Sequence, residues 1–355
     1  MIAGWPEKNF WNNKRVLVTG HSGFKGMWLS LCLYRLGAKV SGISLEPDSL
    51  PNLFNFIDFS NVGQSIFCDI RDSNNLLNQF QSIDPEFIFH LAAQPLVRKS
   101  YINPVDTFSS NVMGTVNVLE CMRSLGNLKA AVMITTDKVY KDHQIQQAYT
   151  ENDPLGGHDP YSSSKAASEI VIDSYKKSFF VDHHVPIATA RAGNVIGGGD
   201  WSEDRLIPDA IRAWENQDIL QIRRPDSTRP WQHVLEPIYG YIMLAQQIAF
   251  NPEKAEAYNF GPDAASTASV RDVITLANNF FGSGKVIYDK VDEGPHEAGW
   301  LSLDITKAKH QLGFLPKWSL SETIEHTISW YKDLKSGQDA FALCNKQIDL
   351  YENAK

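Results

Sequence analysis

Apolar residues in the first half of the chain gather in short runs, and stretches with helical spacing separate these runs. The runs are typical of buried strands and fall at residues 14–20, 38–45, 86–93, 130–136 and 185–193. Helical spacing occurs between them, for example at residues 27–37 and 112–126. Because strands that alternate with helices form a parallel sheet with helices on both faces, the pattern predicts a doubly wound α/β fold for residues 1–192.

The pattern changes after Gly193. A glycine-rich loop, GNVIGGGDW, leads into a helical stretch, and shorter mixed elements follow as far as Trp330. We expect residues 193–355 to form mainly a smaller C-terminal substrate-binding region. Residues 233–262 include the run YNFGP, which is expected to return to the first sheet, and a polar helical tail is expected at the end of the chain.

Charge and cysteine content narrow the possible partners. The 355 residues carry a formal charge of −8 without any run of basic residues, so neither a nucleic-acid backbone nor an anionic membrane surface is an expected partner. The four cysteines are widely spaced without a metal-binding pattern. No segment reaches the roughly 18 apolar residues of a membrane helix. We expect a cytoplasmic protein that holds no metal and binds anionic ligands through a few placed cations.

Three glycines, Gly20, Gly23 and Gly26, follow the first predicted strand and precede a helix. Such glycines permit a tight turn and let a pyrophosphate approach the helix N-terminus, whose free N–H groups favour negative charge. The setting predicts a Rossmann-type site for NAD or NADP and disfavours a turn that is glycine-rich by chance.

Acidic residues downstream bear on the choice of dinucleotide. Glu46, at the end of the second predicted strand, suits the ribose hydroxyl groups, and residues 46–60 contain no Arg or Lys for the additional phosphate of NADP. Asp69 follows a short β-like run, where it can reach the adenine amino group or simply occupy a surface loop. This pattern favours NAD.

Tyr161 and Lys165 lie four residues apart at the start of a predicted helix, so their side chains share one face about 6 Å apart along the axis. An adjacent ammonium and an oxidised nicotinamide ring both favour tyrosinate, which can then remove a hydroxyl proton. The spacing alone is common on solvated helices. Together with the glycine loop and with Thr136 at the end of a strand, it indicates hydride chemistry on an alcohol.

The chain resembles the extended short-chain dehydrogenase/reductase family, in particular its nucleotide-sugar 4,6-dehydratases. The resemblance rests on VTGHSGFKG, FHLAAQP, NVMGTVNVLE, TTDKVY, YSSSK and RAGNVIGGGDW, and it covers residues 10–331. AAQPLVR, RPWQHVLEP and the Asp137–Lys138 pair are most similar to members that act on CDP-glucose. The resemblance implies NAD as the cofactor, with contacts from Gly20, Gly23, Phe24, Lys25, Gly26, Glu46, Asp69, Ile70, Leu91, Ala92, Ala93, Asn111, Thr135, Tyr161 and Lys165.

The same resemblance implies a reaction. Thr136, Tyr161 and Lys165 match the family's residues that oxidise the sugar at C4, and Asp137 matches the acid that protonates the departing C6 hydroxyl group. Hydride passes from C4 to NAD and returns to C6, so that water is lost and a 4-keto-6-deoxy sugar forms.

Lys138 stands where the dTDP-glucose dehydratases have Glu. A lysine can take the C5 proton only in its neutral form, so three roles stay open for Lys138: a base, a residue that stabilises the enolate, or a structural surface residue. Adjacent residues of an extended strand point to opposite faces. We therefore expect Asp137 and Lys138 to contact the sugar from different sides or to lie apart.

A nucleotide sugar also brings a pyrophosphate, which suits the planar fork of arginine. The family implies Arg229 as its main contact and Asn194 as a second one, whereas Arg223 can equally belong to a solvated pair. The candidate substrate-binding residues are Gln94, Arg98, Asn194, Arg205, Arg223, Arg229 and His296. Residues 141–159 depart from the family pattern, and no conformation is predicted for them.

Other functions fit these residues less well. A 4-epimerase needs no acid at C6, a dTDP- or GDP-sugar dehydratase does not account for Lys138 and AAQPLVR, and an NAD-bound sensor without turnover has no need of the Tyr161–Lys165 pair. The resemblance further implies a homodimer or homotetramer built on helices at 111–125 and 161–177, which can alternatively pack only on the sheet. It also implies a role in deoxysugar synthesis for an O-antigen or another surface glycan.

Overall fold

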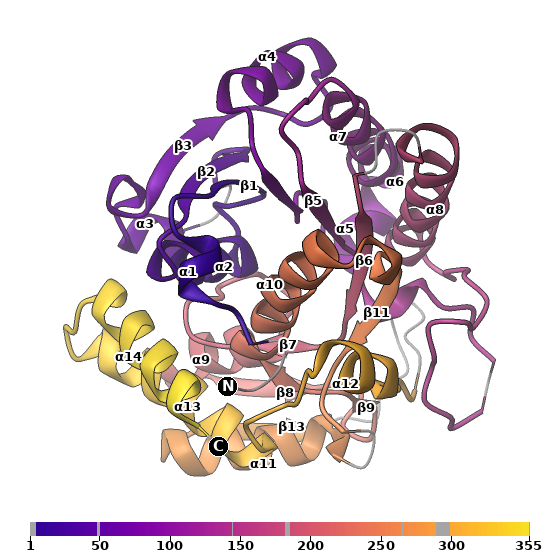
Figure 1. Cartoon of the computed structure of the whole chain (residues 1–355). Helices are drawn as coiled ribbons and strands as arrows, with labels where there is room; N and C mark the ends of the chain where they lie inside the picture. Colours follow the sequence, from indigo (N-terminus) through magenta and orange to yellow (C-terminus); the bar gives the residue numbers. More distant parts are fainter. Residues whose placement is uncertain are drawn as a thin grey trace.

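A seven-stranded parallel sheet forms the centre of the molecule, in the order β11-β6-β5-β4-β1-β2-β3 (Figure 1). The computed structural model describes residues 5–47, 50–143, 145–181, 185–263, 266–288 and 299–354. The predicted doubly wound α/β fold is confirmed. The strands of this sheet are β1 (Arg15–Thr19), β2 (Lys39–Ser44), β3 (Gly63–Phe67), β4 (Phe87–His90), β5 (Ala130–Ile134), β6 (Ile187–Ala192) and β11 (Ala257–Phe260).

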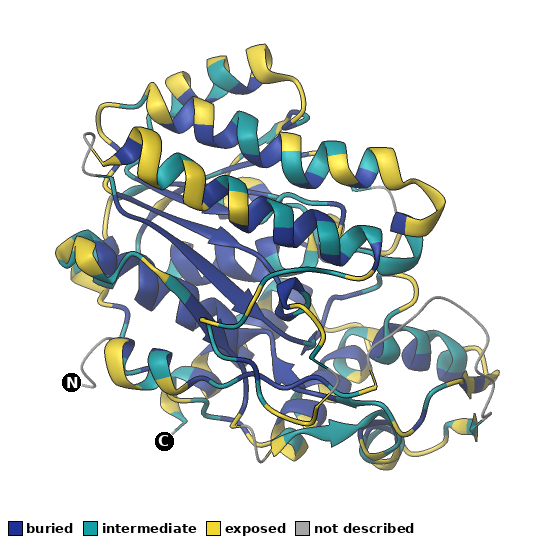
Figure 2. Ribbon diagram, turned by 90° about the vertical axis from the view of Figure 1, so that its right-hand side faces the viewer, coloured by how far each residue is buried: buried dark blue, intermediate teal, exposed yellow. Residues whose placement is uncertain are grey.

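Alternate side chains of the central strands enter two separate hydrophobic layers, as expected of a sheet covered on both faces. Val16 and Val18 of β1 join the layer that contains α2 and α10, whereas Leu17 joins the layer that contains α4, α7 and α8. Figure 2 shows the buried strands between these helices. The helices that cover the sheet are α2 (Phe24–Arg35), α4 (Ser73–Ile83), α7 (Gly114–Arg123), α8 (Pro160–Tyr175) and α10 (Leu235–Phe250).

The second half of the chain contributes to this sheet. Helix α10 packs on β5 and β6, and β11 pairs with β6, with Ala257 opposite Thr189. The run YNFGP therefore does return to the main sheet. The division of the chain into domains at residue 192 stays a prediction.

Short two-stranded sheets and helices form the remaining part of the second half, below the main sheet in Figure 1. Its paired strands are β7 (Val195–Ile196) with β10 (Gln232–His233), β8 (Ile219–Ile222) with β13 (Lys285–Tyr288), and β9 (Thr228–Arg229) with β12 (Ala268–Ser269). Its helices are α9 (Leu206–Glu215), α11 (Val270–Phe281), α12 (Thr306–Leu312) and α13 (Leu320–Lys335). The other short elements of the chain are α1 (Lys8–Trp11), α3 (Leu53–Phe56), α5 (Val97–Ile102), α6 (Pro104–Phe108), η1 (Phe59–Asn61), η2 (Ser109–Met113), η3 (Asp137–Val139), η4 (Lys176–Phe180) and η5 (Pro252–Lys254).

The predicted polar tail is a helix with one buried face. Helix α14 (Ala340–Asn353) packs against α2, α3 and α13 and buries Leu343, Ile348 and Tyr351. The Tyr351 hydroxyl donates to Glu236 of α10 at 2.6 Å, which fastens this helix to the core. Over the described ranges, none of the helices has the length and apolar character to cross a membrane.

Candidate active site

One cavity of about 1120 Å³ lies at the carboxyl ends of the parallel strands, between the sheet and the smaller C-terminal part. Open α/β sheets bind ligands at these strand ends. Ligand cavities usually measure roughly 300–1,000 Å³, so this one has room for a dinucleotide and a second ligand. The cavity is lined by every predicted site residue except Asn111 and His296. His296 lies outside the described residues.

The glycine loop forms one end of the cavity. Gly20 has φ +78°, a backbone conformation that favours glycine, and a Cβ atom there would lie 2.8 Å from the backbone nitrogen of Ala92. A Cβ on Gly26 would lie 2.0 Å from the carbonyl oxygen of Gly20. The loop therefore closes tightly on itself at the N-terminus of α2, where free N–H groups suit a pyrophosphate. This geometry fits a dinucleotide.

Acidic residues lie where the second and third strands end. Glu46 and Asp69 both line the cavity, but the Asp69 carboxylate is bound by the Arg71 guanidinium, with Nη2 2.6 Å from Oδ2. Asp106 also pairs with Arg71. Sequence reasoning overlooked Arg71, which lines the cavity. Because two carboxylates already neutralise it, Arg71 is poorly suited to bind the additional phosphate of NADP.

Asn111, predicted to contact the cofactor, lies behind the cavity wall instead of lining it. Its side chain is 1% exposed and donates to the Gln94 carbonyl and to Ser164 Oγ, while Gln94 N donates to Asn111 Oδ1. The Gln94 amide is likewise occupied, since it donates to Thr107 Oγ1 and accepts from Leu96 N. These two residues shape the wall after β4, next to Leu91, Ala92 and Ala93.

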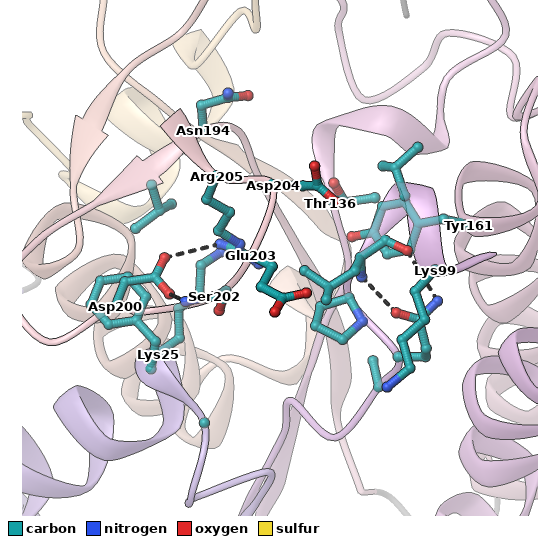
Figure 3. Close-up of a pocket in the computed structure, with 18 of the residues that line it drawn as sticks. Lys25, Lys99, Thr136, Tyr161, Asn194, Asp200, Ser202, Glu203, Asp204 and Arg205 are labelled. Atoms are coloured by element: carbon teal, nitrogen blue, oxygen red, sulfur yellow. Dashed lines mark hydrogen bonds and ion pairs between the residues drawn. The ribbon is translucent and has the colours of Figure 1, made fainter. Parts of the chain in front are cut away.

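Tyr161 and Lys165 face the cavity from the first turns of α8. Asp159 caps this helix by accepting from Ser162 N at 2.9 Å, and Pro160 occupies its first turn, so the sequence fixes where the helix begins. Lys165 Nζ donates to the Ile134 carbonyl at 3.0 Å, which places the ammonium at the end of β5. Figure 3 shows Tyr161 and Thr136 side by side on this wall.

Burial shifts the pKa values of Tyr161, Lys165 and Lys25. It raises the pKa of Tyr161 to about 12, which the hydrogen bond with Thr136 opposes. It lowers the pKa of Lys165 to about 8, which Glu169 opposes. Burial also lowers the pKa of Lys25 to about 7, and the nearby cations Arg205, Lys138 and Lys165 act in the same direction. Tyr161 therefore needs positive charge close to its phenol before it can act as a base near neutral pH.

Asp137 and Lys138 lie together, and the expectation that they point to opposite sides is wrong. Strand β5 ends at Ile134, and residues Asp137–Val139 form a 3₁₀ turn whose N-cap is Thr136. In that turn Lys138 Nζ lies 2.9 Å from Asp137 Oδ1, which also accepts from Thr136 Oγ1 at 2.9 Å. The alternation of an extended strand does not extend to these residues, because the chain has already turned.

Two of the predicted arginines pair with carboxylates of the loop at residues 199–205. Arg98, in α5, pairs with Asp204 at 3.0 Å. Arg205 pairs with Asp200 at 3.5 Å, as Figure 3 shows. Arg229 is 7% exposed and donates to the Thr228 carbonyl at 2.9 Å. The cavity lining thus contains both cations and carboxylates.

The carboxylates of the loop at residues 199–205 were not predicted as cavity residues. Asp200, Glu203 and Asp204 all line the cavity, and Trp201 packs on Trp330 and Tyr331, with ring centroids 5.7 and 5.6 Å apart. The sequence shows a signal for this placement, since these acids directly follow the glycines of GNVIGGGDWSEDR.

Fold and site together define an NAD-type Rossmann enzyme of the epimerase and dehydratase class. The model of the family described as GDP-mannose 4,6 dehydratase matches residues 17–327. The chain is 45% identical to the CDP-glucose 4,6-dehydratase of Salmonella typhimurium over 354 residues, 98% of this chain and 99% of that protein. The chain belongs to this family of nucleotide-sugar 4,6-dehydratases.

Solved structures share the fold. A dTDP-glucose 4,6-dehydratase from Bacillus anthracis, solved in complex with NAD, has a TM-score of 0.76 at 22% identity and covers 92% of this chain and 99% of its own. A UDP-glucose 4-epimerase from Thermotoga maritima has a TM-score of 0.75 at 20% identity and covers 90% of this chain and 99% of its own. Epimerases and dehydratases thus have this fold in common, and the site residues must distinguish them.

Proposed function

We propose that the protein converts CDP-D-glucose to CDP-4-keto-6-deoxy-D-glucose and water. The observation that carries this proposal is the arrangement of Asp137 in the same cavity as Thr136, Tyr161 and Lys165. An acid beside the oxidising residues is what the loss of a C6 hydroxyl group requires. The 45% identity to a CDP-glucose 4,6-dehydratase along almost the whole chain supports this substrate.

NAD is the proposed cofactor, held by the glycine loop, Glu46 and the wall at Leu91, Ala92 and Ala93. The tight approach of Gly26 to Gly20 fits a pyrophosphate at the N-terminus of α2. When bound, NAD would supply the hydride acceptor and donor that oxidation at C4 and reduction at C6 require.

The chain's own residues move the protons. Tyr161, assisted by the Lys165 ammonium, takes the C4 hydroxyl proton, and Thr136 hydrogen-bonds the same oxygen. The resulting ketone acidifies the C5 proton. Asp137 gives a proton to the departing C6 oxygen, and its Oδ2 is suited to this role because it is buried without a hydrogen-bond partner among the described residues. Lys138 takes the C5 proton or stabilises the enolate.

The nucleotide is proposed to lie along the arginines that line the cavity. Arg229, which lines the cavity and is 7% exposed, is the main pyrophosphate contact, since the planar fork of arginine suits phosphate oxygens. Asn194, Arg205 and Arg223 line the same cavity. Substrate binding at Arg98 and Arg205 exchanges their carboxylate partners for phosphate or sugar oxygens.

An assembly of two or four copies is the proposed oligomeric state. Four strongly exposed apolar side chains lie on α5, α6, η2 and α8. Figure 2 views the molecule from the side of α6 and α8. Ile102, Val105, Met113 and Ile170 on this face are 77, 82, 52 and 61% exposed. Such a concentration is typical of a protein–protein interface. We further propose a cytoplasmic location and a role in deoxysugar synthesis for an O-antigen or another surface glycan.

The substrate assignment can be tested by incubating the protein with NAD and, separately, with CDP-, dTDP-, UDP- and GDP-hexoses. A 4-keto-6-deoxy product absorbs in alkali, which gives the readout. Product from CDP-glucose alone is expected. Product from another nucleotide instead would retain the chemistry but overturn the substrate, and a changed C4 configuration without loss of water would favour an epimerase.

A further inference from the structure

A buried ion pair lies behind the catalytic wall, outside the cavity lining. Glu169 of α8 and Arg191 of β6 are 5% and 4% exposed, and neither lines the cavity. Arg191 Nε donates to Glu169 Oε1 at 2.9 Å, and Arg191 Nη2 donates to Oε2 at 3.0 Å. These two hydrogen bonds fix both side chains. Burying two charged groups costs desolvation free energy, so the position of the pair suggests a role beyond stability.

Glu169 and Lys165 hold the end of β5, directly before Thr136. Thr135 Oγ1 donates to Glu169 Oε1 at 2.6 Å, and Lys165 Nζ donates to the neighbouring Ile134 carbonyl at 3.0 Å. Two side chains one turn apart on α8 therefore hold two successive residues at the end of β5. The next residue is Thr136, so this grip sets the position of Tyr161 relative to Thr136.

The pair also connects to Tyr140, a residue that lines the cavity. Arg191 Nη1 donates to the Tyr140 hydroxyl at 2.9 Å, and this hydroxyl donates to Asn259 Oδ1 at 2.6 Å. The network thus joins α8, β5, β6, β11 and the segment that follows the 3₁₀ turn into one fixed unit.

Charge adds a second effect on Lys165. Three titratable groups interact electrostatically with Lys165: Glu169 on the same helix, Lys25 of α2 and His90 of β4. Burial lowers the pKa of His90 to about 3, so His90 is neutral near pH 7. Glu169 is faced in turn by Arg191 and Lys176. Burial lowers the pKa of Lys165 to about 8, and Glu169 is the group that opposes this effect. Loss of the carboxylate would therefore lower the pKa of Lys165 further and reduce the charged fraction of Lys165 near neutral pH.

We propose that Glu169, fixed by Arg191, is a positioning residue that keeps Lys165 as a cation and sets the catalytic geometry at the end of β5. Its catalytic consequence rests on the proposed function, in which the Lys165 cation assists Tyr161. Its structural part concerns the protein alone and can be measured without substrate. A residue that merely stabilised the fold would not change the titration of Lys165.

The direct test is NMR titration of the side-chain Lys165 signal in protein labelled at lysine, with the signal assigned by its loss in Lys165→Met. In the wild-type protein the titration is expected near pH 8. In Glu169→Gln it should move down by about one pH unit or more, because an opposing charge is lost. Glu169→Asp keeps the charge, so the Lys165 signal of this variant should titrate close to the wild-type pH.

Two further variants keep the test decisive. The double variant Glu169→Gln, Arg191→Gln removes both charges and covers the case in which the single variant fails to fold. The Lys165 signal of this double variant should also titrate at a lower pH than in the wild-type protein. Glu236→Gln is the matched control. Glu236 is a buried glutamate like Glu169, at 1% exposure, and it does not line the cavity either. It should leave the Lys165 titration unchanged. An unchanged Lys165 titration in folded Glu169 variants would overturn the inference.

Kinetics separate this inference from the proposed function. If wild-type protein turns over CDP-glucose, Glu169→Gln should lower kcat and move the alkaline limb of its pH profile down by the same amount as the NMR titration, while KM stays nearly constant. An unshifted alkaline limb would overturn the catalytic part of the inference. If the wild-type protein shows no turnover, the proposed function fails, and the NMR titration still decides the inference.

Discussion

Lys138 Nζ and Thr136 Oγ1 both lie 2.9 Å from one oxygen of Asp137, Oδ1, and the other oxygen of this carboxyl group has no partner among the described residues. One oxygen of the group is thus held by two donors, and the other is buried without one. Asp137 is 1% exposed, and a buried oxygen without a hydrogen-bond partner costs free energy. In the proposed function, the departing C6 hydroxyl group supplies the missing partner.

Replacing Asp137 by Asn should separate oxidation from loss of water. The amide keeps the size and one acceptor oxygen of the side chain but has no acidic proton to give. We expect C4 oxidation to continue and the later steps to slow by roughly 10²- to 10⁴-fold, the usual contribution of a general acid. Absorbance of reduced nicotinamide should accumulate, and unimpaired formation of the 4-keto-6-deoxy product would refute the acid role.

Two variants at Lys138 distinguish its possible roles. Lys138→Arg keeps a cation beside Asp137 but cannot accept a proton, and Lys138→Met removes the cation as well. If Lys138 is the base, both variants should lose exchange of the C5 hydrogen with solvent deuterium. If it only stabilises negative charge, Arg should retain most of the exchange and Met should not. Normal exchange in both variants would assign Lys138 to a structural role.

Gly26 is expected to tolerate no side chain. Because a Cβ atom would lie 2.0 Å from the Gly20 carbonyl oxygen, Gly26→Ala must displace the backbone of the glycine loop. Overpacking of this kind costs roughly 1–3 kcal/mol of stability and should also weaken NAD binding. Gly126→Ala is the control, since a Cβ atom there meets nothing within 4 Å. Thermal unfolding and NAD titration of both variants provide the comparison, and equal behaviour would contradict the packing argument.

Glu236 should give the protein a pH-dependent stability. Burial raises the pKa of Glu236 from 4.5 to about 7 in the folded protein, and the hydrogen bonds from the Tyr351 hydroxyl and from the Trp318 and Lys317 N–H groups oppose this shift. Between these two pH values the folded state holds a proton that the unfolded chain releases. Stability should therefore fall as pH rises across this window, by on the order of 3 kcal/mol, and level off above it.

Glu236→Gln should remove that dependence, because the amide does not titrate. Urea unfolding of the two proteins from pH 4.5 to 7 tests this expectation, read as the difference between their free energies of unfolding at each pH. The free energy of unfolding of the variant should increase relative to that of the wild-type protein as pH rises. Two curves that stay parallel would contradict the assigned cause.

A charge on the exposed apolar face should prevent assembly if that face is the interface between copies. Val105 is 82% exposed and Ile170 is 61% exposed, so Glu at either position costs the free subunit little. Light scattering should report a monomer for Val105→Glu and Ile170→Glu. Leu315→Glu is the control, since Leu315 is 59% exposed away from these helices and should leave the assembly unchanged. Unchanged mass in all three variants would move the interface elsewhere.

Much of this site could be predicted because local rules fix it. The glycine spacing places Gly20 and Gly26 at the start of α2, and the spacing of one helical turn places Tyr161 and Lys165 on one face of α8. The central strands were predictable because both of their faces are buried, which makes them continuous apolar runs. Each of these features depends only on residues close together in the chain.

The remaining features depend on contacts that a local pattern does not contain. The 3₁₀ turn that brings Lys138 to Asp137 follows directly after a strand whose alternation predicted the opposite. The Gln94 amide is occupied by Thr107 and Leu96, and Asp204 reaches Arg98 from a distant part of the sequence. In the segment 141–159, Tyr149 is likewise held by a distant partner, since Tyr149 N donates to the Ser302 carbonyl at 3.0 Å.

The central claim is that one hydride moves from C4 to C6 within a single sugar. It is tested most directly by supplying CDP-glucose carrying deuterium at C4 and locating the label in the product by NMR. The account predicts deuterium at C6, together with a hydrogen from solvent at C5. Deuterium retained at C4 of an epimerised sugar, or lost from the product altogether, would contradict it.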